Sequence, residues 1–178
     1  MRTGKGIILR LNKLTETSLI VTWCVEGVGL VKTVAKGARR PKSAFAGKLD
    51  LFFSAELSWV DSSKSELGIL KELVVTDYAE GIRKQYKNTM LAGYFSSLTE
   101  WVMESGEVDD DIYGLLVRAY AYLTEKTAEK RALIHFEKEL AKLLGVWDGK
   151  SEPQFSLKKA FGRLPKNREV CEGLLEES

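Results

Sequence analysis

The stretch SLIVTWCV, residues 18–25, decides the fold of the first half of the chain. Its larger apolar side chains occupy every second position: Leu19, Val21, Trp23 and Val25. Successive side chains of a β-strand point to opposite faces, so this period of two predicts a half-buried antiparallel strand. The segment EGVG that follows, residues 26–29, predicts a hairpin connection because its two glycines readily adopt positive φ.

The same alternation continues on both sides of this strand. It predicts four further strands, at residues 5–14, 30–36, 49–59 and 66–76. In the first of them, Ile7, Leu9 and Leu11 are expected on one face and Ile8 on the other. Five short antiparallel strands in fewer than eighty residues favour a small closed or partly closed barrel over a sandwich.

The apolar period changes near Asp77 from two to the spacing of helices. This spacing predicts helices from about Ile82 to Val102, from a cap at residues 109–111 to about Leu123, and over residues 127–144. Gly145 is expected just beyond the last of these, and residues 146–178 are expected to form a loop, one or two helical turns near Leu157–Phe161 and a frayed acidic end. The fold class is therefore α+β, with a barrel at residues 1–78 and a helical domain at 79–178.

Charge is distributed unevenly along the chain. The formal net charge is only +2, yet residues 1–50 contain ten Lys and Arg against three Asp and Glu, and the rest contains seventeen against twenty-two. This asymmetry indicates a polyanion-binding surface in the N-terminal part, with a merely solvated basic face as the alternative. A hydrophobic content of 44% and a charged content of 29% argue against wholesale disorder.

The loop KGARRPKS, residues 36–43, is the most distinctive segment. It places four cations within seven residues, Lys36, Arg39, Arg40 and Lys42, where glycine and proline disfavour a helix. Grouped cations on a loop can contact successive phosphates, and arginine can also stack on bases. We therefore favour nucleic-acid binding over a solvated loop. The neighbouring Phe45 could stack on a base, but plugging the end of the barrel is the favoured role.

No catalytic or metal-binding constellation is visible in the sequence. His135 is the only histidine, Cys24 and Cys171 are the only cysteines, and a zinc site needs more ligands than these. Two distant cysteines exclude a disulfide framework and favour a reducing compartment. We expect no enzyme activity, no cofactor and no bound metal. Because no signal peptide or membrane span is found, we expect a cytoplasmic protein with no membrane partner.

Several segments of the N-terminal half occur in the order and spacing of a known family. They are KGIILR (5–10), ETSLIVT (16–22), GLV (29–31), AKGARRPKS (35–43), FAG (45–47) and ELGILKE (66–72). With these segments the chain resembles the RecO family of bacterial recombination mediators over about residues 1–76. The helical half is similar in layout more than in residues.

The resemblance implies an OB-fold barrel followed by an α-helical domain. It also implies binding of single- and double-stranded DNA, annealing of complementary strands, and help in loading the recombinase RecA. The partners it implies are RecR and the acidic C-terminal tail of single-stranded DNA-binding protein. Many members carry a four-cysteine zinc module after the helices, so this chain is expected to be a short, zinc-free member. The alternatives are an RNA-binding OB-fold module and a structural adaptor whose barrel is only a scaffold.

Site residues follow from the loop and from the resemblance. Lys36, Arg39, Arg40 and Lys42 are expected to form the principal DNA contact. The resemblance places the tail-binding site in the helical half, where Arg118, Lys130 and Arg131 lie on adjacent predicted helices with apolar residues. For each of these three, the alternative is a cation that is solvated or paired with Glu125 or Glu129.

Overall fold

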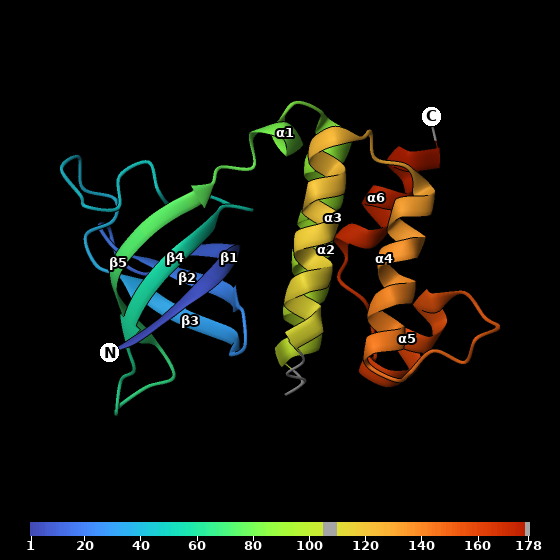
Figure 1. The fold of residues 1–178 in the computed structure, drawn as a ribbon, viewed down its shortest axis with the longest axis horizontal. Helices are drawn as coiled ribbons and strands as arrows, with labels where there is room; N and C mark the ends of the chain where they lie inside the picture. The colour runs from blue at the N-terminus through green and yellow to red at the C-terminus, as the bar shows by residue number, and fades with distance from the viewer. Residues whose placement is uncertain (105–109, 177–178) are drawn as a thin grey trace. The chain divides into compact units, whose positions relative to one another are not determined.

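The computed structural model describes residues 1–104 and 110–176, and the chain divides into two units, Met1–Ala79 and Glu80–Ser178. The first unit is a closed barrel of five strands with the order β1-β2-β3-β5-β4 (Figure 1). Its strands are β1 (Arg2–Lys13), β2 (Leu19–Val25), β3 (Gly29–Ala35), β4 (Ser54–Val60) and β5 (Gly68–Asp77). This barrel and the helices after it confirm the predicted fold class.

The prediction that all strands pair antiparallel is wrong at one place. β3 and β5 pair in parallel, with Thr33 opposite Gly68 and Val34 opposite Ile69. The number of strands is the reason. When every neighbour in a ring runs in the opposite direction, the number of strands is even, so a closed ring of five contains at least one parallel pair.

The barrel core is formed by the inward face of β2 and its neighbours. Val21, Trp23 and Val25 belong to the core as predicted, and Trp23 Nε1 donates a hydrogen bond to Thr33 Oγ1 at 2.9 Å. The predicted faces of β1 are wrong at Leu11, because the register shifts between Ile8 and Arg10. Residues three apart in a regular strand lie on opposite faces. Because of this β-bulge, Ile8 belongs to the core and Leu11 also packs against the core.

Residues 49–53 do not extend the fourth strand as predicted. β4 begins only at Ser54, and Phe52 has a φ of 73°, which no strand accommodates. Phe53 belongs to the barrel core and Leu49 packs against it. Apolar residues in this segment therefore cover the barrel core from an irregular loop, although their spacing is that of a strand.

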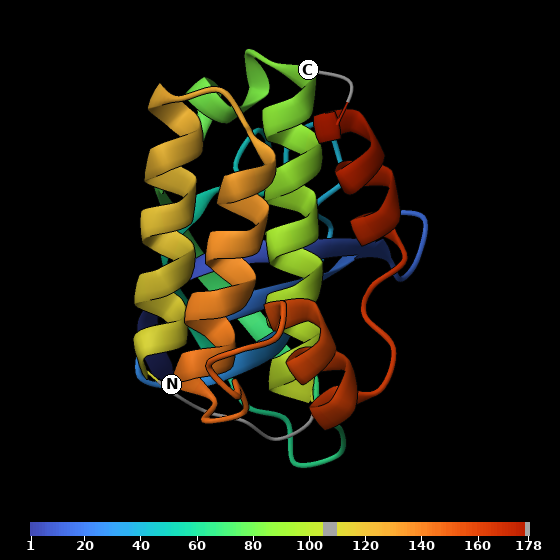
Figure 2. The ribbon, with the colours of Figure 1, turned by 90° about the vertical axis from the view of Figure 1, so that its right-hand side faces the viewer.

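The second unit contains six helices in its described residues. They are α1 (Glu80–Arg83), α2 (Tyr86–Glu104), α3 (Asp110–Glu125), α4 (Lys130–Leu143), α5 (Pro153–Phe161) and α6 (Asn167–Glu176). Figure 2 shows α2, α3 and α4 side by side, with α5 and α6 packed at their flank. Among the helices described, none combines the length and apolarity that spanning a bilayer requires.

The ends of the helices differ in how well the sequence predicted them. Gly145 has a φ of 66° and donates its N–H to the carbonyl of Lys142, which confirms its place after α4. The predicted cap at residues 109–111 begins outside the described residues. The predicted frayed acidic end is wrong, because residues 167–176 form α6, which buries Arg168, Cys171 and Leu175.

Candidate nucleic-acid interface and partner groove

The loop between β3 and β4, residues 36–53, is a series of hydrogen-bonded turns. Its backbone N–H groups donate three residues back along the chain, at 3.0 to 3.1 Å, from Arg40 to Gly37, Ser43 to Arg40, Ala46 to Ser43 and Lys48 to Phe45. Gly37, with a φ of 66°, supplies the left-handed conformation at the start of the series. The loop therefore has a defined path without being a helix or a strand.

This loop is fastened to the turn between β1 and β2. The backbone N–H of Arg39 donates to the carbonyl of Thr17 at 2.9 Å, and its guanidinium Nη1 donates to the carbonyl of Glu16 at 3.2 Å. The N–H of Gly37 donates to Ser18 Oγ at 3.2 Å. Further along the loop, Phe45 is buried in the barrel core, so its ring is not a stacking surface.

The predicted DNA-contacting residues all lie on the first part of this loop. Lys36, Arg39, Arg40 and Lys42 are exposed. Within residues 1–104 and 110–176, no carboxylate lies within 4.0 Å of any of the four. Glu16, whose backbone carbonyl accepts from Arg39, pairs its carboxylate with Lys13 at 2.7 Å. The loop thus presents uncompensated positive charge to solvent, with Arg39 held by the neighbouring turn.

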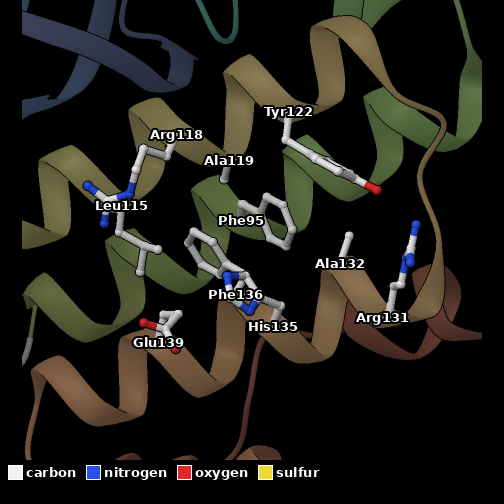
Figure 3. A pocket seen from close by; sticks show the side chains of 10 residues that line it. All are labelled: Phe95, Leu115, Arg118, Ala119, Tyr122, Arg131, Ala132, His135, Phe136 and Glu139. Atoms are coloured by element: carbon white, nitrogen blue, oxygen red, sulfur yellow. The ribbon is translucent and has the colours of Figure 1, made fainter.

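The helical unit contains a groove of about 520 Å³ between α3 and α4. Its floor is aromatic, since Phe95 of α2 and Phe136 of α4 stack with ring centroids 4.1 Å apart and an interplanar angle of 17°. Figure 3 shows Arg118 and Arg131 at opposite ends of the groove, with the two rings between them. Two of the three predicted partner-binding cations therefore line one apolar groove.

The charges around the groove differ in their pairing. Arg131 Nε lies 2.7 Å from Glu129 Oε2, and both side chains are largely exposed, so this pair contributes little. Arg118 has no carboxylate within 4.0 Å among the described residues. On the groove wall, a hydrogen bond from Lys142 at 3.0 Å holds the pKa of Glu139 below its ordinary value.

The third predicted cation, Lys130, does not line this groove. Its Nζ lies 2.6 Å from Glu176 Oε1 and 3.3 Å from Glu172 Oε1, so it ties α4 to α6. The hydrogen bond to Glu176 raises the pKa of Lys130. The apolar spacing predicts the helix that carries Phe136, but it does not show that this ring stacks on Phe95 in the floor of a groove.

No bound metal is predicted from the sequence. In the part of the chain that the structure describes, no three His, Cys, Asp or Glu side chains are grouped so as to hold a metal ion. Cys24 and Cys171 are both free and buried, and they lie in different units.

Comparison with known proteins gives a consistent result. Residues 1–79 match the family described as Recombination protein O N terminal. The chain is similar to proteins named DNA repair protein RecO: it is 25% identical to that of Rhodopirellula baltica over 140 residues, 79% of this chain and 52% of that protein. It is 28% identical to that of Salinibacter ruber over 143 residues, 80% of this chain and 55% of that protein. The chain thus spans about half the length of the curated relatives it matches.

Proposed function

We propose that the protein is a DNA-binding recombination mediator in DNA repair, without catalytic activity of its own, because residues 1–79 match the family described as Recombination protein O N terminal. The observation that carries the proposal is the loop between β3 and β4, where four exposed cations have no carboxylate partner among the described residues. An OB-fold barrel with a basic surface is a common platform for nucleic acids.

The loop is suited to the phosphate backbone more than to bases. Lys36, Arg40 and Lys42 extend from consecutive turns, so they can contact successive phosphates, whereas Arg39 is held against the carbonyl of Glu16. Phe45 is buried and is not available for stacking. Contacts of this kind carry no sequence information, and they suit single- and double-stranded DNA alike.

Neutralisation of phosphates by these cations also supports the proposed annealing of complementary strands. Two complementary strands repel each other, and cations that screen this repulsion favour annealing. The resemblance to RecO supports three further partners: RecR, the single-stranded DNA-binding protein and, indirectly, the recombinase RecA. Since the chain spans about half of its relatives' length, these partners are part of the proposal.

For the single-stranded DNA-binding protein, the groove between α3 and α4 is the proposed docking site. An acidic, apolar-ended tail needs an apolar pocket with cations at its rim, and the groove has an aromatic floor with Arg118 and Arg131 at its ends. Tail carboxylates can pair with these guanidinium groups, because such charge-assisted bonds are stronger than neutral ones. Lys130 is not part of this site, because its ammonium group forms ion pairs with Glu172 and Glu176.

The test measures binding of single-stranded DNA, duplex DNA and single-stranded RNA of one length at several salt concentrations. The variant R40E/K42E removes two cations that do not anchor the loop through their side chains. Loss of two phosphate contacts should lower the salt slope for single strands by about 1.4. The matched control K64E/K71E makes the same change of charge at exposed positions elsewhere on the barrel and should leave the slope unchanged.

Other results would favour the competing functions. Tighter binding of RNA than of DNA would indicate an RNA-binding module, and negligible affinity at low salt would indicate a structural adaptor. Wild-type affinity in a folded R40E/K42E variant would move the DNA site to another part of the protein. A strand-annealing assay with and without bound single-stranded DNA-binding protein then tests the mediator activity itself.

A further inference from the structure

We infer that the helical unit carries a second binding site for the phosphate backbone of nucleic acid, at the turn between α5 and α6. Residues 153–168 contain five basic side chains and no acidic one. The other residues of 80–178 contain ten basic and seventeen acidic side chains. A solvated surface would mix the two signs, so this concentration of positive charge in an otherwise acidic unit calls for a function.

The cations of this segment surround a hollow. A depression of about 510 Å³ is lined by Lys158, Arg163 and Lys166, all of which are exposed, with Glu169 as the one acid at its wall. Among the described residues, no carboxylate lies within 4.0 Å of these three cations or of the exposed Lys159. Arg168 also lines the hollow, but its guanidinium is bound to Glu137 and Glu172. Four cations are therefore available to an anionic ligand.

Helix electrostatics explain only half of this cluster. Lys158 and Lys159 lie in the last turn of α5, where a cation stabilises the helix dipole. Arg163 lies beyond the helix, and Lys166 immediately precedes α6, where the positive end of the dipole disfavours a cation. The helix dipoles therefore do not account for the charge at these two positions, which is better explained by a ligand.

Aromatic rings beside these cations favour nucleic acid over an acidic peptide. The guanidinium carbon of Arg163 lies 5.8 Å from the ring centroid of Trp101, and Lys158 Nζ lies 5.9 Å from that of Phe155. Phe155 is 56% exposed, so its ring can also stack on a base. Cations interleaved with aromatic rings are typical of surfaces that bind single strands.

The test uses the full chain and a short thymidine oligonucleotide at low salt, with stoichiometry and salt slope as readouts. Wild type should bind two oligonucleotides per chain, and the variant K158E/K166E should bind one, with a salt slope lower by about 1.4 for longer single strands. The control K84E/K126E makes the same change of charge at exposed positions of the same unit and should behave as wild type. If charge reversal lowers the melting temperature, the neutral variant K158Q/K166Q replaces it.

The same titration separates this site from the barrel loop. R40E/K42E should also bind one oligonucleotide, and the combination of both double variants none. Unchanged stoichiometry and slope in a folded K158E/K166E or K158Q/K166Q would overturn the second site, whatever the loop variant does. The site would also be overturned if these variants lost an acidic peptide while keeping both oligonucleotides. Loss of binding in K158E/K166E alone would support this site and refute the barrel loop.

Discussion

The guanidinium of Arg168 donates two hydrogen bonds to the carboxylate of Glu137, from Nε to Oε1 at 2.6 Å and from Nη2 to Oε2 at 3.1 Å. Both side chains are almost fully buried, at 6% and 1% exposed. The hydroxyl of Tyr94 donates to the same carboxylate at 2.6 Å. Since these residues come from α6, α4 and α2, a single buried carboxylate joins three helices.

Removing the guanidinium from this cluster should destabilise the protein strongly. In Arg168→Met the carboxylate of Glu137 stays buried without its counter-charge, so we expect the free energy of unfolding to fall by about 3–5 kcal/mol in urea titrations. Arg131→Met breaks only the exposed ion pair with Glu129 and should change the free energy of unfolding by less than about 1 kcal/mol. The double variant E137Q/R168M keeps an acceptor for Tyr94 and should recover part of the loss. A loss below 1 kcal/mol in R168M would contradict this account.

The two thiols should make stability fall at alkaline pH. Burial raises the pKa of Cys24 to about 12 and that of Cys171 to about 11, against about 8.5 for an unfolded thiol. Above pH 8.5 the folded state therefore holds more protons than the unfolded state, so the free energy of unfolding decreases as pH rises toward 11. Urea titrations between pH 7.5 and 10 measure this decrease, which should be smaller in C24A/C171A. An equal slope in that variant would show that other groups cause it.

Phe45 should connect the stability of the barrel to the shape of its basic loop. Its ring is part of the barrel core, so Phe45→Ala should lower the free energy of unfolding by about 3 kcal/mol, and DNA affinity should fall because the loop loses an anchor. Phe45→Leu should keep most of both properties. Phe155→Ala removes an exposed ring and should leave the melting temperature within a degree or two. If F45A is as stable as F155A, the ring does not anchor the loop.

The groove between α3 and α4 should distinguish its two arginines from Lys130. Replacing Arg118 or Arg131 by Glu should lower the affinity for a labelled tail peptide by at least about tenfold, since hydrogen bonds to charged groups contribute about 1.5–3 kcal/mol. Lys130→Ala should leave peptide affinity unchanged and lower stability slightly, because it removes the ion pairs with Glu172 and Glu176 of α6. Fluorescence anisotropy measures the first effect and thermal melts the second. Equal losses in all three variants would indicate non-specific attraction.

Much of the barrel follows from local patterns, and its errors have identifiable causes. Val21 and Trp23 were placed in the core correctly because a regular strand has a strict period of two. The same rule failed in β1, where the bulge after Ile8 shifts the period, and at Phe52, whose positive φ ends the alternation. Neither a β-bulge nor an aromatic residue with a left-handed backbone conformation has a reliable signature in a single sequence. The parallel pair, in contrast, follows from counting five strands.

The helical unit shows a different limit. A charged segment such as 167–176 looks solvated by composition, but Arg168 is buried because Glu137, far away in sequence, neutralises it. For the groove, helical spacing predicted the helix that carries Phe136 and placed cations on adjacent helices. It could not show that Arg118 and Arg131 face one groove while Lys130 turns toward α6. That distinction depends on the orientation of each helix about its own axis in the folded protein.

The parallel pair that closes the barrel has a consequence for how the barrel forms and opens. The ladder of β3 and β5 includes only two residue pairs, against seven between β2 and β3. It also needs Gly68, where a Cβ would lie 3.0 Å from Trp59 Cδ1 and 3.2 Å from the carbonyl of Val60. A ladder with few hydrogen bonds that joins distant parts of the chain is expected to form late in folding and to break first in native fluctuations. Transient opening at this seam would expose two strand edges, the surface through which one chain can capture a strand of another.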